Sequence, residues 1–204
     1  MMTRGIYIAL EGIEGAGKST VAIALAALIA GAGHDVMTVR EPGGTPTGEK
    51  VRQILLETDG SVAPWSEALL FSAARAQLAA DVVEPALQAG TWVVSDRSVY
   101  SSLAYQGAGR GLGIDAVRAV NEPGLGRTWP DLVALLQLGV ADGLSRQQVP
   151  DRIGAAGHGF LALVADGFAH LAAAEPDRFV VVDATMPVAD VAAEIWKALQ
   201  DCHG

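Results

Sequence analysis

Residues 12–19 read GIEGAGKS. They match the pattern G-x-x-x-x-G-K-[ST], in which glycines let backbone N–H groups turn inward around phosphate oxygens. A β-rich run precedes the motif, and an Ala/Leu-rich run suited to a helix follows it; a helix N-terminus also favours anions. In this context the motif predicts a nucleoside triphosphate site. The alternative is a glycine-rich turn that binds nothing.

Strand-like and helix-like runs alternate along the rest of the chain. The β-rich runs are Ile6–Leu10, Val36–Val39, Trp92–Ser95, Leu132–Leu138 and Phe179–Asp183. Helices are expected over 19–32 and 65–89, with a kink or break at Pro85. Loops are expected over 107–113 and 150–159. The alternation predicts an α/β fold of the P-loop NTPase type: a five-stranded parallel sheet flanked by helices, in one domain over 1–204.

Composition excludes several functional classes. The 204 residues are 50% hydrophobic, enough for a buried core, and the net charge of -9 argues against a general nucleic-acid binder. Cys202 is the sole cysteine, and the four histidines lack metal-ligand spacing. The N-terminus has no signal-peptide pattern, and the apolar run 21–30 is too short to span a membrane. We therefore expect a soluble cytoplasmic protein with no membrane or nucleic-acid partner.

Three further segments point to a second substrate. They are REPGGT at 40–45, LLFSAARAQ at 69–77, and Asp96-Arg97 followed by Ser101 and AYQG at 104–107. Phe71 and Arg75 are four residues apart, so on a helix they share a face, where a ring can stack on a base and an arginine can bond its edge. The first and third segments follow strands, and ligands of open α/β sheets bind at the carboxyl ends of strands.

Together with DATMP at 183–187, these motifs resemble the thymidylate kinase family. The family pattern combines EGxEGAGKST, REPGGT, LLFxAxRAQ, DRxxxSxxAYQG and a late DAT-x-P, and the resemblance extends from about Gly5 to Leu199. It implies a nucleoside monophosphate kinase fold with a short mobile lid over about 143–159. It also implies transfer of the γ-phosphoryl group of ATP to dTMP with Mg²⁺, giving dTDP and ADP in dTTP synthesis, by a homodimer.

The resemblance assigns roles to individual residues. ATP is expected to contact Gly12, Ile13, Glu14, Gly15, Ala16, Gly17, Lys18, Ser19 and Thr20. The motif itself places Lys18 at the β- and γ-phosphates and Ser19 on Mg²⁺, and the resemblance adds Asp96 as a metal-binding residue that acts through water. The dTMP site is expected to comprise Arg40, Pro42, Arg52, Phe71, Arg75, Arg97, Ser101, Tyr105 and Gln106.

Within that set, Phe71 is expected to stack on thymine and Arg75 to bond its edge, while Tyr105 packs against the deoxyribose. The expected catalytic residues are Lys18, Arg97, Arg146, Arg152 and Glu14. Phosphoryl transfer needs two anions held in line with their charge neutralised, so no strong general base is expected. Each residue also has a structural alternative: Phe71 could be ordinary core, and the arginines could be solvated or in structural ion pairs.

The expected lid departs from the family pattern. Gly15 occupies a place where another subgroup has arginine, so the lid must supply catalytic arginines, and this lid offers Arg146 and Arg152 alone. Two other readings stay open: a P-loop kinase acting on a different nucleotide or nucleoside, and a nucleotide-binding relative with weakened catalysis.

Overall fold

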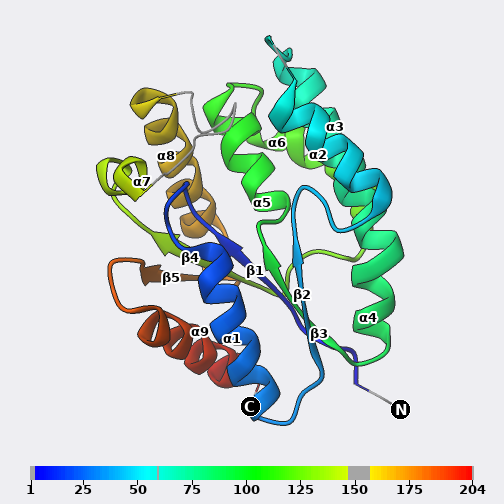
Figure 1. The fold of residues 1–204 in the computed structure, drawn as a ribbon, viewed down its shortest axis with the longest axis vertical. Helices are drawn as coiled ribbons and strands as arrows, with labels where there is room; N and C mark the ends of the chain where they lie inside the picture. Colours follow the sequence, from blue (N-terminus) through cyan, green and yellow to red (C-terminus); the bar gives the residue numbers. More distant parts are fainter. Residues whose placement is uncertain (1–2, 59, 147–156, 204) are drawn as a thin grey trace.

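The computed structural model describes residues 3–58, 60–146 and 157–203, and its centre is a parallel sheet. The strands are β1 (Tyr7–Glu11), β2 (Val36–Arg40), β3 (Trp92–Asp96), β4 (Leu132–Gln137) and β5 (Phe179–Asp183). They lie in the order β2-β3-β1-β4-β5 (Figure 1). The sheet confirms the predicted five-stranded α/β fold.

The central strand β1 is buried along its whole length, as expected for a strand covered on both faces. Ala9 pairs with Ser95 of β3 and with Val133 of β4. The predicted strand ended at Leu10, one residue early, because a charged residue usually marks the end of an apolar run. Here the carboxylate of Glu11 is itself buried, so the strand continues through it.

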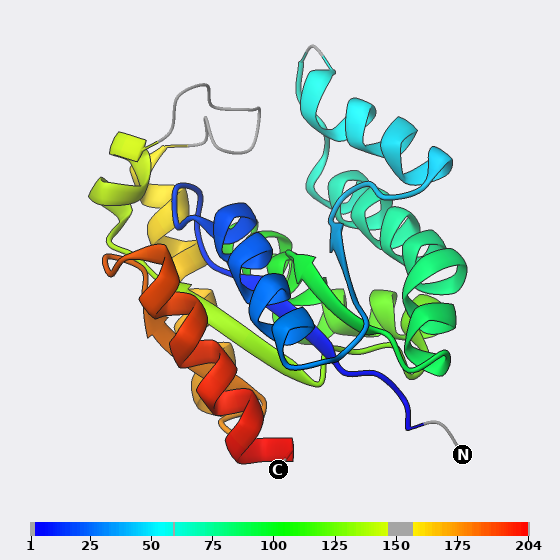
Figure 2. The same ribbon diagram turned by 60° about the horizontal axis from the view of Figure 1, so that its bottom comes forward.

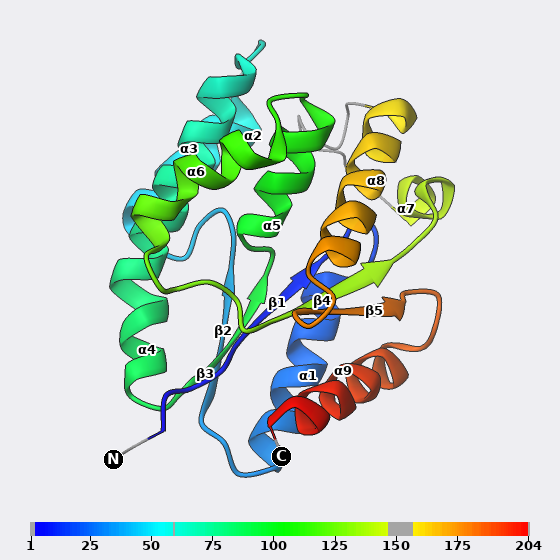
Figure 3. The ribbon, with the colours of Figure 1, turned by 180° about the vertical axis from the view of Figure 1, so that it is seen from behind.

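Helices cover both faces of the sheet. Their bounds are α1 (Lys18–Gly31), α2 (Pro46–Glu57), α3 (Pro64–Leu78), α4 (Glu84–Gln88), α5 (Val99–Ser102), α6 (Ile114–Leu125), α7 (Val140–Arg146), α8 (His158–Ala174) and α9 (Val188–His203). Helices α1 and α9 pack together on one face, seen in front in Figure 1, whereas α5, α6 and α8 lie on the other, seen from behind in Figure 3. In Figure 2, α2 and α7 flank the turn between β1 and α1 from opposite sides.

Two short π-helices interrupt the helical pattern of the described residues. The predicted helix 65–89 runs through η1 (Ala79–Val83), and Pro85 then lies in the first turn of α4, where its missing N–H is tolerated. The predicted loop 107–113 is wrong in its first part, because η2 (Leu103–Gly109) includes the first three residues. Glycine there allows close packing: a Cβ on Gly109 would lie 2.8 Å from the Phe160 ring.

The expected lid is described at its two ends only. Helix α7 covers 140–146 and α8 begins at His158, so helix replaces part of the loop predicted over 150–159. Residues 147–156, which include Arg152, lie outside the described residues. None of the helices that the structure describes combines the length and the apolar character that a membrane span requires.

Leu25 tests the packing of α1 on the core. Its side chain is fully buried in the cluster that includes Ile195 of α9, whereas Ile23 on the same helix is 69% exposed. We expect Leu25→Ala to lower the free energy of unfolding by about 2–5 kcal/mol, because it leaves a cavity. Ile23→Ala is the matched control and should change it by less than about 0.5 kcal/mol. Urea unfolding of both variants measures the difference, and equal losses would contradict this packing.

Candidate active site

The glycine-rich turn between β1 and α1 has the backbone that a phosphate cradle needs. Gly12, Gly15 and Gly17 all have positive φ, a region that side chains disfavour. A Cβ on Gly12 would lie 2.6 Å from the carbonyl oxygen of Leu136, so no larger residue fits. The turn leads directly into Lys18, the first residue of α1. The predicted strand–turn–helix context of residues 12–19 is therefore confirmed.

Lys18 is buried inside this turn. Its Nζ donates to the carbonyl oxygens of Gly12 (3.1 Å) and Ile13 (2.8 Å). Burial, and then the nearby positive charge of Arg97, lowers the pKa of Lys18 to about 7, while neighbouring carboxylates oppose the shift. An anion entering the turn would supply the negative charge that favours the ammonium form.

Ser19 and Asp96 meet beside the turn. The Ser19 hydroxyl, on the first turn of α1, donates to the Asp96 carboxylate at the end of β3. Hydroxyl and carboxylate oxygens are the ligands that Mg²⁺ prefers, so this pair fits the metal expected here. Among the described residues, no group of three or more His, Cys, Asp or Glu side chains could hold a metal ion by itself.

Arg97 joins the turn to the rest of the site. Its guanidinium donates to Glu14 Oε1 (3.1 Å), to the Gly12 carbonyl (3.3 Å) and to Ser101 Oγ (3.2 Å). The Tyr105 hydroxyl donates to the other oxygen of Glu14 (2.8 Å), and Arg97 stacks over the Tyr105 ring at 5.1 Å. Burial raises the pKa of Tyr105, which keeps its hydroxyl protonated as a donor. The structure thus brings Glu14 of the glycine-rich turn together with Arg97, Ser101 and Tyr105 of the third segment, all of them predicted site residues.

Glu11 fixes the chain that follows Arg97. Its buried carboxylate accepts four hydrogen bonds, from the backbone N–H and hydroxyl of Ser98 (2.8 and 2.7 Å) and of Ser101 (3.0 and 2.6 Å). Arg97 itself has φ 73°, a strained value for a residue with a side chain. Sequence reasoning did not assign Glu11 to the site. A carboxylate ending an apolar strand directly before the glycine-rich turn was the available signal.

A pocket opens next to Arg97 and Glu14. Its lining comprises Glu14, Glu41, Pro42, Arg52, Leu56, Phe71, Arg97, Ser101, Ser102, Tyr105 and Gln106. Most of the residues predicted for the second substrate therefore lie around one cavity. Arg52 is held there by a hydrogen bond from Nη1 to the Pro42 carbonyl (2.9 Å). Ser102 was missed, although it directly follows a predicted residue and shares its helical turn.

Arg75 lies behind this pocket rather than among its lining residues. Its guanidinium donates to Glu41 (2.7 Å), Asn121 (2.6 Å), the Ser98 carbonyl (3.1 Å) and Ser102 (3.0 Å), and its side chain is 2% exposed. The alternative of a solvated arginine is therefore wrong. The network joins four separate segments, and its contact with a base edge stays a prediction.

Two predicted arginines point elsewhere. Arg40 donates to the Glu49 carboxylate (3.0 and 3.1 Å) and is not in the pocket lining. Arg146, on α7, donates to the carbonyl oxygen of Ala184 (3.2 Å), in the DATMP segment. Helix α7 nevertheless contacts the glycine-rich turn: a Cβ on Gly15 would lie 2.4 Å from the carbonyl oxygen of Gly143. An arginine at position 15 would displace this helix.

Replacing Glu11 should loosen the whole site. In Glu11→Gln, an amide nitrogen replaces an acceptor oxygen and faces serine donors in a buried space, which costs about 1–3 kcal/mol of unfolding free energy. Glu57→Gln, on the exposed end of α2, carries the same charge change and should alter stability by less than about 0.5 kcal/mol. Urea unfolding measures both. A Glu11 variant as stable as the Glu57 variant would show that the four hydrogen bonds contribute nothing.

Comparison with known proteins agrees with this geometry. A family model described as "Thymidylate kinase" matches residues 10–195. The chain is 47% identical to a thymidylate kinase of Deinococcus radiodurans, over 98% of each chain. It is 44% identical to that of Desulforudis audaxviator, over 94% of this chain and 89% of the relative, and 41% identical to that of Bacillus pumilus, over 97% and 96%. Since the match covers nearly the whole chain, motifs and pocket included, the protein belongs to the thymidylate kinase family.

Proposed function

We propose that this protein is a dTMP kinase that transfers the γ-phosphoryl group of ATP to dTMP, giving dTDP and ADP. The observation that carries the proposal is the continuity of two sites. A glycine-rich phosphate turn and a pocket containing Phe71 are joined by the Arg97–Glu14 ion pair (3.1 Å). Two anions bound on either side of this pair would meet at the carboxyl edge of the sheet, where the transfer must occur.

The donor end binds the phosphates of ATP. Backbone N–H groups of 12–19 cradle them, and Lys18, released from the carbonyls it now contacts, bonds the β- and γ-phosphate oxygens. Ser19 and Asp96 are the residues that would hold Mg²⁺, directly or through water. When bound, the metal would supply positive charge that offsets the negative charge of the donor phosphates.

The acceptor end orients dTMP. Phe71 stacks on thymine, Tyr105 packs against the deoxyribose, and Arg97 with Arg52 binds the monophosphate. The Arg97 guanidinium already donates hydrogen bonds to Glu14 and Ser101, so its orientation is set before the substrate binds. Because a preorganised cation costs little reorganisation during transfer, this arrangement favours stabilisation of the charge that develops on the phosphoryl oxygens.

Arg146 and Arg152 are proposed to complete the charge neutralisation from the lid. Arg146 would have to leave the Ala184 carbonyl and turn toward the donor phosphates. Its helix is close enough to act with the glycine-rich turn, because Gly143 packs on Gly15. The role of Arg152 rests on the sequence alone, because this residue lies outside the described residues, and it stays a prediction.

Further properties of the enzyme are proposed from the family resemblance. They are a single kinase domain over 1–204, a homodimer and a cytoplasmic location. Exposed apolar side chains on α3, Trp65 and Leu69, are 42% and 53% accessible, which supports an association surface. Sedimentation analysis in solution gives the mass of the assembly and so tests the dimer.

A panel assay separates the candidate activities. ADP release with ATP and Mg²⁺ is measured for each nucleoside monophosphate in turn, and we expect dTMP to be preferred. Faster turnover of another monophosphate would support a P-loop kinase of different specificity. Binding of ATP and dTMP without ADP release would support a relative with weakened catalysis.

Lys18→Ala should nearly abolish transfer and leave dTMP affinity largely intact. The reason is that Lys18 meets the donor phosphates rather than the acceptor base. Single-turnover ADP release and calorimetric titration with dTMP separate the two effects. Normal turnover in the folded variant would contradict the assignment of the phosphate turn.

Phe71→Ala should weaken dTMP binding and leave ATP binding almost unchanged. Stacking of a base on an aromatic side chain contributes about 1–3 kcal/mol in other nucleotide sites. Because Phe71 also packs on the core, circular dichroism must first show that the variant folds. Unchanged dTMP affinity by calorimetry in a folded variant would show that the ring is ordinary core.

A further inference from the structure

A buried carboxylate sits behind the pocket with no part in phosphoryl transfer. Glu67, on α3, is fully buried and accepts a hydrogen bond from Gln106 Nε2 (2.9 Å). It also accepts from Arg110, through Nε to Oε1 (3.1 Å) and through Nη2 to Oε2 (3.3 Å). The Arg110 guanidinium also stacks over the Phe160 ring at 4.4 Å, and this contact fixes the orientation in which its N–H groups face Glu67.

This contact decides which way the Gln106 amide faces. An ionised carboxylate can only accept hydrogen bonds, whereas the amide has an NH₂ donor at one side and a carbonyl acceptor at the other. Glu67 therefore holds the NH₂ side toward itself. The arginine fork supplies the positive charge that a buried carboxylate needs, so Glu67 remains an acceptor.

The carbonyl oxygen of Gln106 is left facing the pocket. Gln106 lines that pocket, and within the described residues its Oε1 has no hydrogen-bond partner. Every fully buried side-chain nitrogen or oxygen of the described chain does have one. The Oε1 atom therefore keeps a small exposed surface although Gln106 as a whole is 1% exposed, and the pocket is the open space that Gln106 borders.

The base is the part of the substrate that this oxygen meets. Glu67 and Phe71 lie four residues apart on α3, so they share one helix face. Gln106 is bonded to Glu67 and so lies one turn from the ring proposed to stack on thymine. Thymine has a single N–H donor on its base, N3–H, between two carbonyl oxygens. In cytosine the N3 atom is an acceptor. Its lone pair would face a lone pair of the Gln106 carbonyl oxygen, and the two would repel each other.

We propose that Glu67 is a positioning residue that selects thymine over aminopyrimidines by locking the Gln106 carbonyl toward N3–H of the base. The inference rests on the proposed dTMP kinase activity and adds a residue that touches no substrate. A site built to bond a particular N–H discriminates strongly against an analogue that lacks it, because its own polar group is then left unpaired.

The test compares two monophosphates that differ only in the base edge, dTMP and 5-methyl-2′-deoxycytidine 5′-monophosphate. Their ratio of kcat/KM is measured for wild type and for Glu67→Gln. The glutamine can donate as well as accept, so the Gln106 amide is free to turn over. We expect the ratio to fall by about tenfold or more, mainly through the KM for dTMP, with the KM for ATP unchanged. If the ratio of the two kcat/KM values in the variant stays within about twofold of the wild-type ratio, the proposal is overturned, even when both activities are lower.

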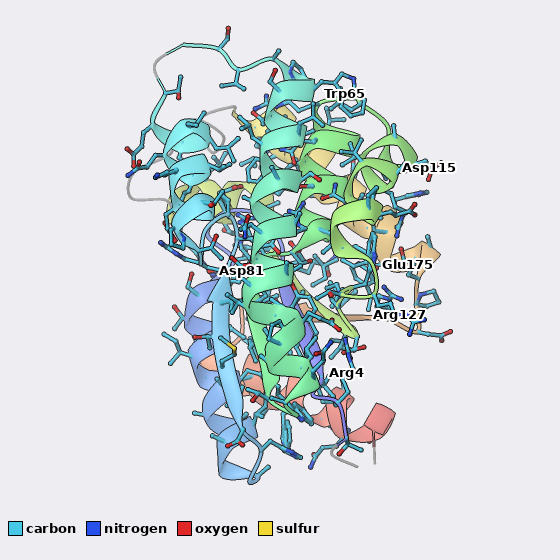
Figure 4. All side chains as sticks on the ribbon, turned by 90° about the vertical axis from the view of Figure 1, so that its right-hand side faces the viewer. Arg4, Trp65, Asp81, Asp115, Arg127 and Glu175 are labelled. Atoms are coloured by element: carbon cyan, nitrogen blue, oxygen red, sulfur yellow. The ribbon has the colours of Figure 1, made fainter. Side chains whose placement is uncertain are left out.

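Glu175→Gln is the matched control. Glu175 loses the same charge and also pairs with an arginine, Arg118 (2.6 Å), but it lies beyond α6 from the helix that carries Glu67 (Figure 4). Its ratio should equal that of wild type. A ratio lowered as much as in Glu67→Gln would assign the effect to general loosening and overturn the proposal.

A second variant keeps the test valid if Glu67→Gln unfolds. Gln106→Met removes the carbonyl but keeps the length of the side chain, and it should lower the same ratio by about tenfold or more. An unchanged ratio in this variant would overturn the proposal. Wild-type turnover of dTMP in the same assay reports on the proposed function by itself, so its failure is distinguishable from failure of this inference.

Discussion

The site depends on one buried carboxylate at the end of the central strand. The Glu11 side chain is fully buried, and burial raises the pKa of its carboxyl. Burying a charged carboxylate costs free energy unless hydrogen bonds or opposite charges compensate it. The compensation comes from two N–H groups and two hydroxyls that belong to the chain after β3. That chain must therefore wrap around the end of β1. Arg97 lies at the start of the wrap and takes the strained left-handed backbone that the geometry imposes.

The same contact links the two proposed substrate sites. Strands β1 and β3 are neighbours, and the glycine-rich turn leaves β1 directly after Glu11. Ser101 donates to Glu11 and accepts from Arg97, which in turn donates to Glu14 in the turn. A shift of the Ser98–Ser101 segment would thus move the cation proposed to bind both phosphoryl groups. The net charge of -9 does not prevent the binding of anionic substrates, because the electrostatic potential at the site is set mainly by the charged groups nearby.

Much of this arrangement follows from sequence because its signals are local. The strand–turn–helix pattern around 12–19 needs only neighbouring residues, and the buried runs of β1 and β4 show that the sheet is covered on both faces. Glu67 was missed because its role comes from contacts between distant segments. Glu11 and Ser102 each had a local signal, but their roles also depend on such contacts. Glu67, for example, accepts a hydrogen bond from Gln106, which lies 39 residues later in the sequence. Residues 107–109, the last three of η2, were predicted as loop because glycines are usually turn residues, and here they allow close packing instead.

The π-helix also explains how two consecutive residues can serve one pocket. In an α-helix adjacent side chains diverge by about 100°. The i→i+5 hydrogen bonds of η2 make a wider turn, so the angle between neighbours is smaller and Tyr105 and Gln106 can both face the cavity. Tyr105 then donates to Glu14 on the proposed phosphate side, while Gln106 donates to Glu67 on the proposed base side. Each of these two neighbours is held by a carboxylate from a different element, so the distance between the proposed phosphate end and the proposed base end is fixed within a single helical turn.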